Sequence, residues 1–258
     1  MTFRYHGSAL GIGGRLDLPS RVNIPTQACA VLSPSGGESS MTVRDYSYQG
    51  ILSFDEATAY ATGSRDDDTY NTLAMVTIRN LSIFGMIEVE RLVARITSTH
   101  RIANGKVGEA EITFTGSTFK GVTIGGVPIK VELDTNVFSR FPTFDGYVAE
   151  FQDQIKNVLD GADPRDGVMG TIVQHVDPPF RPPDNEKRTH PSNYYERADV
   201  RASRHLLHIP HFGTIVLGEV QLEKGYRRLN MLRVDLGCPI TGSLTFGSVE
   251  GNGADIPP

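Results

Sequence analysis

The sequence predicts a mainly β protein, an antiparallel β-sandwich or barrel with one helix near 147–160 and a long proline-rich loop near 177–192. Apolar and polar residues alternate over residues 127–133, and a side-chain period of two is typical of a strand with one buried and one solvated face. Gly125-Gly126 separates two apolar runs, which is a hairpin signal. Thr, Val and Ile are dense from Leu73 to Leu133, and β-branched residues favour strands.

The N-terminal part predicts an irregular or edge segment followed by strands. Glycines and prolines crowd residues 1–40, and proline cannot donate within a central ladder. Aromatic and aliphatic residues at 46–54 predict a strand pair, and the charged residues 65–68 predict a turn. A strand follows at 73–83. Residues 86–99 contain an apolar stripe at helical spacing, but their β-branched content favours a long strand.

The C-terminal part combines one helix, a polar excursion and further strands. Apolar residues recur at helical spacing from Tyr147 to Leu159, and Gly161 stands where a C-terminal cap belongs. Asp177 to Ser192 is rich in proline and charge, so it predicts a solvated excursion. Three strands are expected after it, at 214–222, 229–236 and 240–249, and then a loose tail at 251–258. The whole predicts a single β-rich domain, 1–258, with a long excursion at 177–211.

Composition and charge exclude some classes of function. The formal net charge of −5 and the pI near 5.8 argue against nucleic acid as a partner. No apolar run approaches the roughly 20 residues that span a bilayer, and no signal-peptide pattern is present, so we expect a soluble chain without a transmembrane segment. Cys29 and Cys238 either form a disulfide or remain buried free thiols, and two cysteines alone favour the thiols.

The histidines His205, His208 and His211 are the sharpest candidate for chemistry. Neutral imidazoles bind transition metals, which suggests a site for a divalent metal ion and no other cofactor. On a strand, however, His208 points away from His205 and His211, and Pro210 ends any helix that would gather them. This spacing favours partly exposed histidines at the start of a strand. No nucleophile elbow, P-loop or zinc-protease motif is present.

A second candidate is a basic and aromatic cluster within the proline-rich excursion. Arginine and tyrosine side chains together suit an anionic glycan, a lipid head group or an acidic partner, although nearby carboxylates dilute the charge and favour a solvated loop. The candidate binding residues are Arg181, Arg188, Tyr194, Tyr195, Arg201 and Arg204.

The strand sequences also carry a resemblance. The segments Thr72–Ile83, Gly121–Ile129 and Leu229–Gly237 resemble bacterial surface proteins of the choice-of-anchor P type over about half the chain. In that group, Gly- and Thr-rich strands alternate with short turns, and the proteins are exported to the cell surface. The resemblance implies an extracellular or cell-surface location in a bacterium and supplies no catalytic residues.

Three functions are consistent with these features. The first is a non-enzymatic exported or cell-surface β protein with a binding or structural/assembly role, whose partner is a surface glycan or a protein. The alternative is a metal- or histidine-dependent enzyme on the β scaffold. The second alternative is a toxin-like membrane-active β protein. Because long Thr- and Val-rich strands favour edge pairing, we also expect a homo-oligomer.

Overall fold

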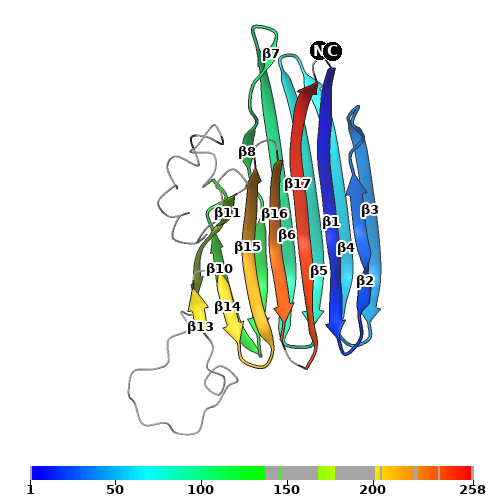
Figure 1. Cartoon of the computed structure of the whole chain (residues 1–258), viewed down its shortest axis with the longest axis vertical. Coiled ribbons are helices and arrows are strands. Elements are labelled where there is room, and N and C mark those ends of the chain that lie inside the picture. Colours follow the sequence, from blue (N-terminus) through cyan, green and yellow to red (C-terminus); the bar gives the residue numbers. More distant parts are fainter. Residues whose placement is uncertain are drawn as a thin grey trace.

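Two antiparallel sheets packed face to face form the protein in the computed structural model (Figure 1). This is the mainly β, antiparallel sandwich that the alternating sequence predicts. The expected helix near 147–160 and the proline-rich loop near 177–192 lie outside the described residues. The structure describes residues 2–136, 144, 146, 168–177, 201–203, 205–223, 226–237 and 239–256.

The first sheet has eight strands within the described residues. In spatial order they are β13 (Arg201–Ser203), β14 (Leu206–Ile209), β15 (Gly213–Glu223), β16 (Tyr226–Leu236), β17 (Thr241–Ile256), β1 (Thr2–Leu18) and β2 (Val22–Val31). The short strand β11 (Val168–Thr171) also pairs with β15. The expected strands at 214–222, 229–236 and 240–249 are therefore confirmed.

The second sheet has nine strands. In spatial order they are β12 (Val173–Asp177), β10 (Val127–Leu133), β9 (Thr118–Ile124), β6 (Ile87–Ala103), β5 (Thr69–Ile83), β4 (Leu52–Asp66) and β3 (Gly37–Tyr48). The short strands β7 (Lys106–Val107) and β8 (Glu111–Thr113) also pair with β6. The hairpin at Gly125-Gly126 and the long strand at 86–99 are confirmed.

The structure corrects expectations about both chain ends. The irregular or edge segment expected over residues 1–40 is confirmed for β2, an edge strand, but is wrong for the Gly-rich residues of β1, a central strand between β17 and β2. Residues 251–256 of the tail expected to be loose belong to β17, where Ile256 pairs with Thr2. The two ends of the chain therefore lie side by side at one end of the sandwich (Figure 1).

A single apolar cluster fills the space between the sheets. β17 packs across β5 and β6, and β1 packs across β4 and β5. Phe54, Phe114 and Phe246 are fully buried, and alanines on the inner faces of β4 and β5 are fully buried beside them. Burial of large apolar side chains at this density is the main favourable term for the fold.

One continuous segment, which contains β11 and β12, passes from the first sheet to the second and links them at one side. β11 pairs with β15, and the next strand, β12, pairs with β10. At the crossing, the Ile172 N–H donates to the Gly218 carbonyl (2.9 Å), and the Asp134 N–H donates to the Ile172 carbonyl (2.7 Å). The backbone N–H and C=O of Ile172 at the crossing therefore both have hydrogen-bond partners, one in β15 and one just after β10.

A row of left-handed residues crosses the first sheet. Gly218 in β15, Gly247 in β17 and Ala28 in β2 have φ of 57°, 63° and 53°. The strand registers place Met231 of β16 between the first two, and Gly11 of β1 between the last two. Left-handed residues therefore occupy every second strand along a single line.

The second sheet repeats this arrangement. Asp45 in β3, Asn80 in β5 and Gly121 in β9 have φ of 52°, 50° and 62°. The registers place Asp55 of β4 and Glu90 of β6 between them. We call the two lines the left-handed rows.

Each left-handed row changes which side chains face the core. Ile78 and Leu81 of β5 are both buried although they lie three residues apart, while Arg79 and Asn80 between them are exposed. A regular strand alternates with a period of two, so the inward phase shifts by one residue at the row.

Candidate functional site

A polar stripe runs along the outer face of β16, the strand between β15 and β17. Its side chains alternate with buried residues, and the phase changes where Met231 and Leu232 are both buried. We call it the β16 stripe, and it consists of Tyr226, Arg228, Asn230, Arg233 and Asp235.

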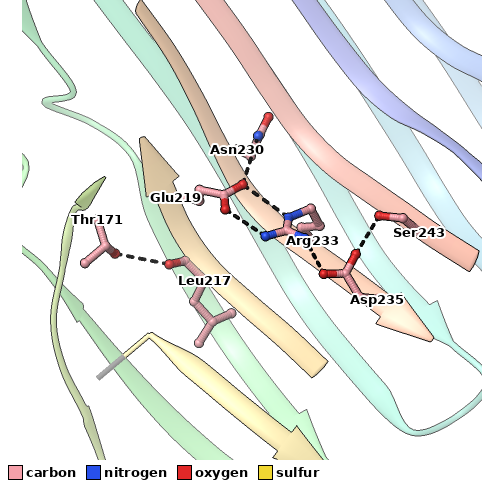
Figure 2. Close-up of polar contacts among 7 residues, drawn as sticks. All are labelled: Thr171, Leu217, Glu219, Asn230, Arg233, Asp235 and Ser243. Carbon is pink, nitrogen blue, oxygen red and sulfur yellow. Dashed lines mark hydrogen bonds and ion pairs between the residues drawn. The ribbon is translucent and has the colours of Figure 1, made fainter. Parts of the chain in front are cut away.

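Glu219 of β15 binds the middle of the β16 stripe (Figure 2). The Arg233 guanidinium donates to both Glu219 oxygens, from Nη2 at 2.8 Å and from Nε at 3.2 Å, and Asn230 donates to the same carboxylate at 3.3 Å. Arg233 also pairs with Asp235, which accepts from Ser243 Oγ at 2.7 Å. Burial alone would lower the pKa of Arg233, but the two carboxylates outweigh it and raise that pKa.

Glu250 of β17 is the centre of a second cluster at one end of the β16 stripe. Its carboxylate lies 3.5 Å from His6 Nε2 and accepts hydrogen bonds from Ser8 Oγ (3.2 Å), Tyr226 Oη (2.8 Å) and Arg228 Nε (2.6 Å). The hydrogen bond with His6, together with those from Arg228 and Tyr226, lowers the pKa of Glu250 to about 2. The same contact raises the pKa of His6. The Glu250 carboxylate is thus ionised and contacts four side chains.

The low pKa of Glu250 predicts a loss of stability in acid. Because the folded-state pKa of Glu250 lies below the usual 4.5, its contribution to stability is lost as the pH falls from 4.5 toward 2. The pKa of His6 is raised above 6.5, so the contribution of the His6 contact is full below 6.5 and is lost as the pH rises through the folded-state pKa of His6. We expect Glu250→Gln to lower the free energy of unfolding by about 2 kcal/mol at pH 7 and by less as the pH falls from 4.5 toward 2. Urea unfolding at several pH values measures the difference.

The matched control is Glu88→Gln, which alters an exposed carboxylate of the other sheet that accepts from Thr123 Oγ1 at 3.1 Å. We expect it to change stability by less than about 0.5 kcal/mol. A gap between wild type and Glu250→Gln that stays constant from pH 7 to pH 2 would contradict the assignment.

A third polar cluster is buried near the chain ends. His100 of β6 is 5% exposed, and its Nδ1 lies 2.9 Å from the Gly108 carbonyl while its Nε2 lies 3.0 Å from the side-chain amide of Asn252. Phe3 packs edge-on against the imidazole at 5.1 Å and stacks on Tyr70 at 4.1 Å. The ring joins β6, the segment after β7, and β17.

The open edge of the sandwich is the feature best suited to bind a macromolecule. β2 ends one sheet and β3 ends the other, and the two strands lie against each other on the same long side of the molecule (Figure 1). Within the described residues, β3 pairs only with β4. Most side chains of β3 are exposed, including Met41 at 47%. An edge with unpaired N–H and C=O groups is a template for another strand.

The three predicted histidines occupy different local positions. His205 is half-buried in the turn before β14, and His208 lies exposed within β14, where its Nδ1 is 3.3 Å from Thr214 Oγ1. His211 is exposed in the following turn with a φ of 62°. Among the residues that the structure describes, no three His, Cys, Asp or Glu side chains gather as metal ligands. The metal hypothesis therefore gains no support from this region.

The predicted basic cluster falls mostly outside the described residues, namely at Arg181, Arg188, Tyr194, Tyr195 and Arg204. The backbone of Arg201 lies in β13, where it pairs with His208. Cys29 is a free thiol, but it is exposed on β2 rather than buried, and Cys238 lies outside the described residues. Within the described ranges no helix has the length and apolar character to cross a membrane.

Sequence reasoning missed both the β16 stripe and the open edge. The signal for the stripe was present, because Arg228 and Asn230, and then Arg233 and Asp235, alternate with apolar residues. Their partners Glu219 and Glu250 come from other strands, so the ion pairs depend on the strand order.

These features define an antiparallel β-sandwich protein with an ordered polar face and an unpaired strand edge. The chain belongs to the family described as Domain of unknown function (DUF8256), whose model matches residues 3–169. Comparison with curated proteins and with solved structures found no match. The matched segment runs from β1 into β11, whereas β15, β16 and β17 complete the sheet of β1 from beyond it.

Proposed function

We propose that the protein has a non-enzymatic binding or structural/assembly role at the bacterial cell surface, and that β3 receives a strand of its partner. Strand addition to a sheet edge is a common mode of recognition, in which main-chain hydrogen bonds supply affinity and side chains supply specificity. The resemblance to choice-of-anchor P-type surface proteins supports the location.

One observation carries this proposal, namely the contrast between the two edge strands. β2 contains Pro25 and the left-handed Ala28, two devices that interrupt pairing at an exposed edge. β3 contains no proline, and its own left-handed non-glycine residue, Asp45, lies toward one end of the strand, so residues 38–44 form a regular stretch. An edge on which such a stretch is regular and mostly exposed suits a partner strand.

The test is to label the chain on intact cells with a membrane-impermeant amine reagent and then to size the labelled protein after gentle extraction. Lys120 and Lys130 are 66% and 71% exposed, so a surface-displayed chain will react. We expect labelled wild-type chain in a complex larger than one chain. Met41→Lys places a charge on the β3 edge and should release labelled monomer.

The matched control is Leu206→Lys, because Leu206 is an exposed apolar residue on β14, which lies in the other sheet from β3 and toward the end of that sheet opposite to β2. We expect this variant to stay in the large complex. Labelling that requires cell lysis would overturn the location, and labelled wild-type chain that elutes as a monomer would overturn the assembly role.

A further inference from the structure

The partner strand can be specified from the sequence of the edge itself. We propose that β3 pairs with β3 of a second copy of this chain, antiparallel, around a two-fold axis that passes through Met41. This inference rests on the proposed role of the β3 edge, and it names both the partner and the register.

The symmetry limits the registers that are available. A two-fold axis normal to the sheet keeps the outward side chains of both copies on the same side, so an outward residue must face an outward residue. Thr42 and Arg44 face outward, because they contact Thr58 and Glu56 across the outer face of β4. Glu38 lies in the same phase as Thr42 and Arg44. The two-fold axis must therefore pass through a residue, because an axis midway between two residues would place an outward residue opposite an inward one.

Charge complementarity then selects one register. With the axis at Met41, Glu38 of each copy faces Arg44 of the other, which gives two ion pairs. Moving the axis by one residue places Glu38 opposite Thr42 or opposite Tyr46, and both ion pairs are lost. Opposite charges directly across two strands stabilise their pairing, and like charges destabilise it.

Both charged groups are available for this contact. The Arg44 side chain is 69% exposed and lies 3.0 Å from Glu56, so one face of its guanidinium is occupied and the rest is open to solvent. Glu38 is exposed, and it forms no ion pair among the described residues. A second copy would therefore provide Glu38 with a cation.

An apolar contact supports the same axis. Met41 is one of few exposed large apolar side chains in the described residues, and at this register it meets Met41 of the second copy. Val31 of β2, 62% exposed, lies on the same long side of the sandwich. Pairing through β3 would bring the two β2 edges toward each other and cover both side chains.

Sedimentation equilibrium of the purified chain tests the register by charge reversal. We expect wild type to form a dimer, and Glu38→Arg and Arg44→Glu each to raise the dimer dissociation constant by about tenfold or more. The double variant should return to within about threefold of wild type, because the two ion pairs reform with reversed polarity. Met41→Lys should be monomeric and Leu206→Lys dimeric.

The outcomes separate this inference from the proposed function. A purified wild-type chain that stays monomeric to about 0.5 mM would overturn self-pairing. If labelled chain on cells were nevertheless in a large complex that Met41→Lys dissolves, the edge would bind a different protein and the proposed function would stand. A dimer whose double variant is as weak as the single variants would overturn the register.

Discussion

Gly247→Ala is expected to lower the free energy of unfolding by about 3 kcal/mol. Gly247 has a φ of 63°, and a Cβ at this position would lie 2.5 Å from Leu92 Cδ2. Leu92 is fully buried, so it has little room to move away. Conformational strain and overpacking therefore act together, and chemical denaturation measures their sum.

Two other glycines separate these causes. Gly126 has a φ of 80° with nothing within 4 Å of an added Cβ, so Gly126→Ala tests strain alone and should cost about 1 kcal/mol. Gly251 lacks a positive φ but faces Ile96 at 3.2 Å, so Gly251→Ala tests crowding alone. A loss at Gly247 no larger than either of these would contradict the combined effect.

His100→Ala should destabilise the fold by about 3 kcal/mol. The change removes a buried ring and leaves the Gly108 carbonyl and the Asn252 amide without their imidazole partner. Both partner atoms are oxygens that accept, the Gly108 carbonyl at Nδ1 and Asn252 Oδ1 at Nε2, so the ring is the donor and its removal leaves buried acceptors without a partner. Thermal and urea unfolding measure the loss.

His208→Ala is the control, because His208 is exposed and contacts Thr214 at 3.3 Å. We expect it to change stability by less than about 0.5 kcal/mol. His100→Gln retains one donor and one acceptor and should recover part of the loss. Equal effects at the two histidines would show that the buried cluster contributes little.

The sequence predicts the strands of this fold better than their interruptions. Alternation locates β10, β15 and β16 because their inward faces are apolar. The glycines of β1 misled the interpretation of the N-terminus, since glycine is usually a strand breaker. An added Cβ at Gly14 would lie 2.6 Å from the Ser243 carbonyl, so that glycine permits close approach of β17 and keeps β1 within the sheet.

The candidate edge is harder to predict from sequence for a topological reason. β3 resembles other strands locally, and it becomes an edge only because β4 occupies one side while the strand before it, β2, belongs to the other sheet. Likewise, Arg233 reads as a surface residue until β15 brings Glu219 beside it. The order of the 17 strands in the described part of the chain is a long-range property that local periodicity does not encode.

The left-handed rows have a consequence for errors in strand alignment. In a plain strand, sliding by two residues restores the inward phase, so such an error carries little cost in burial. In this protein the inward-facing phase of a strand reverses at the left-handed row. A slide of any length therefore moves some residues across the row, where their phase no longer matches. Polar residues such as Arg79 and Asn80 would then enter the core. In each sheet, a strand shift by an even number of residues therefore costs free energy, as an odd shift does. This favours a single alignment of the strands in the folded state.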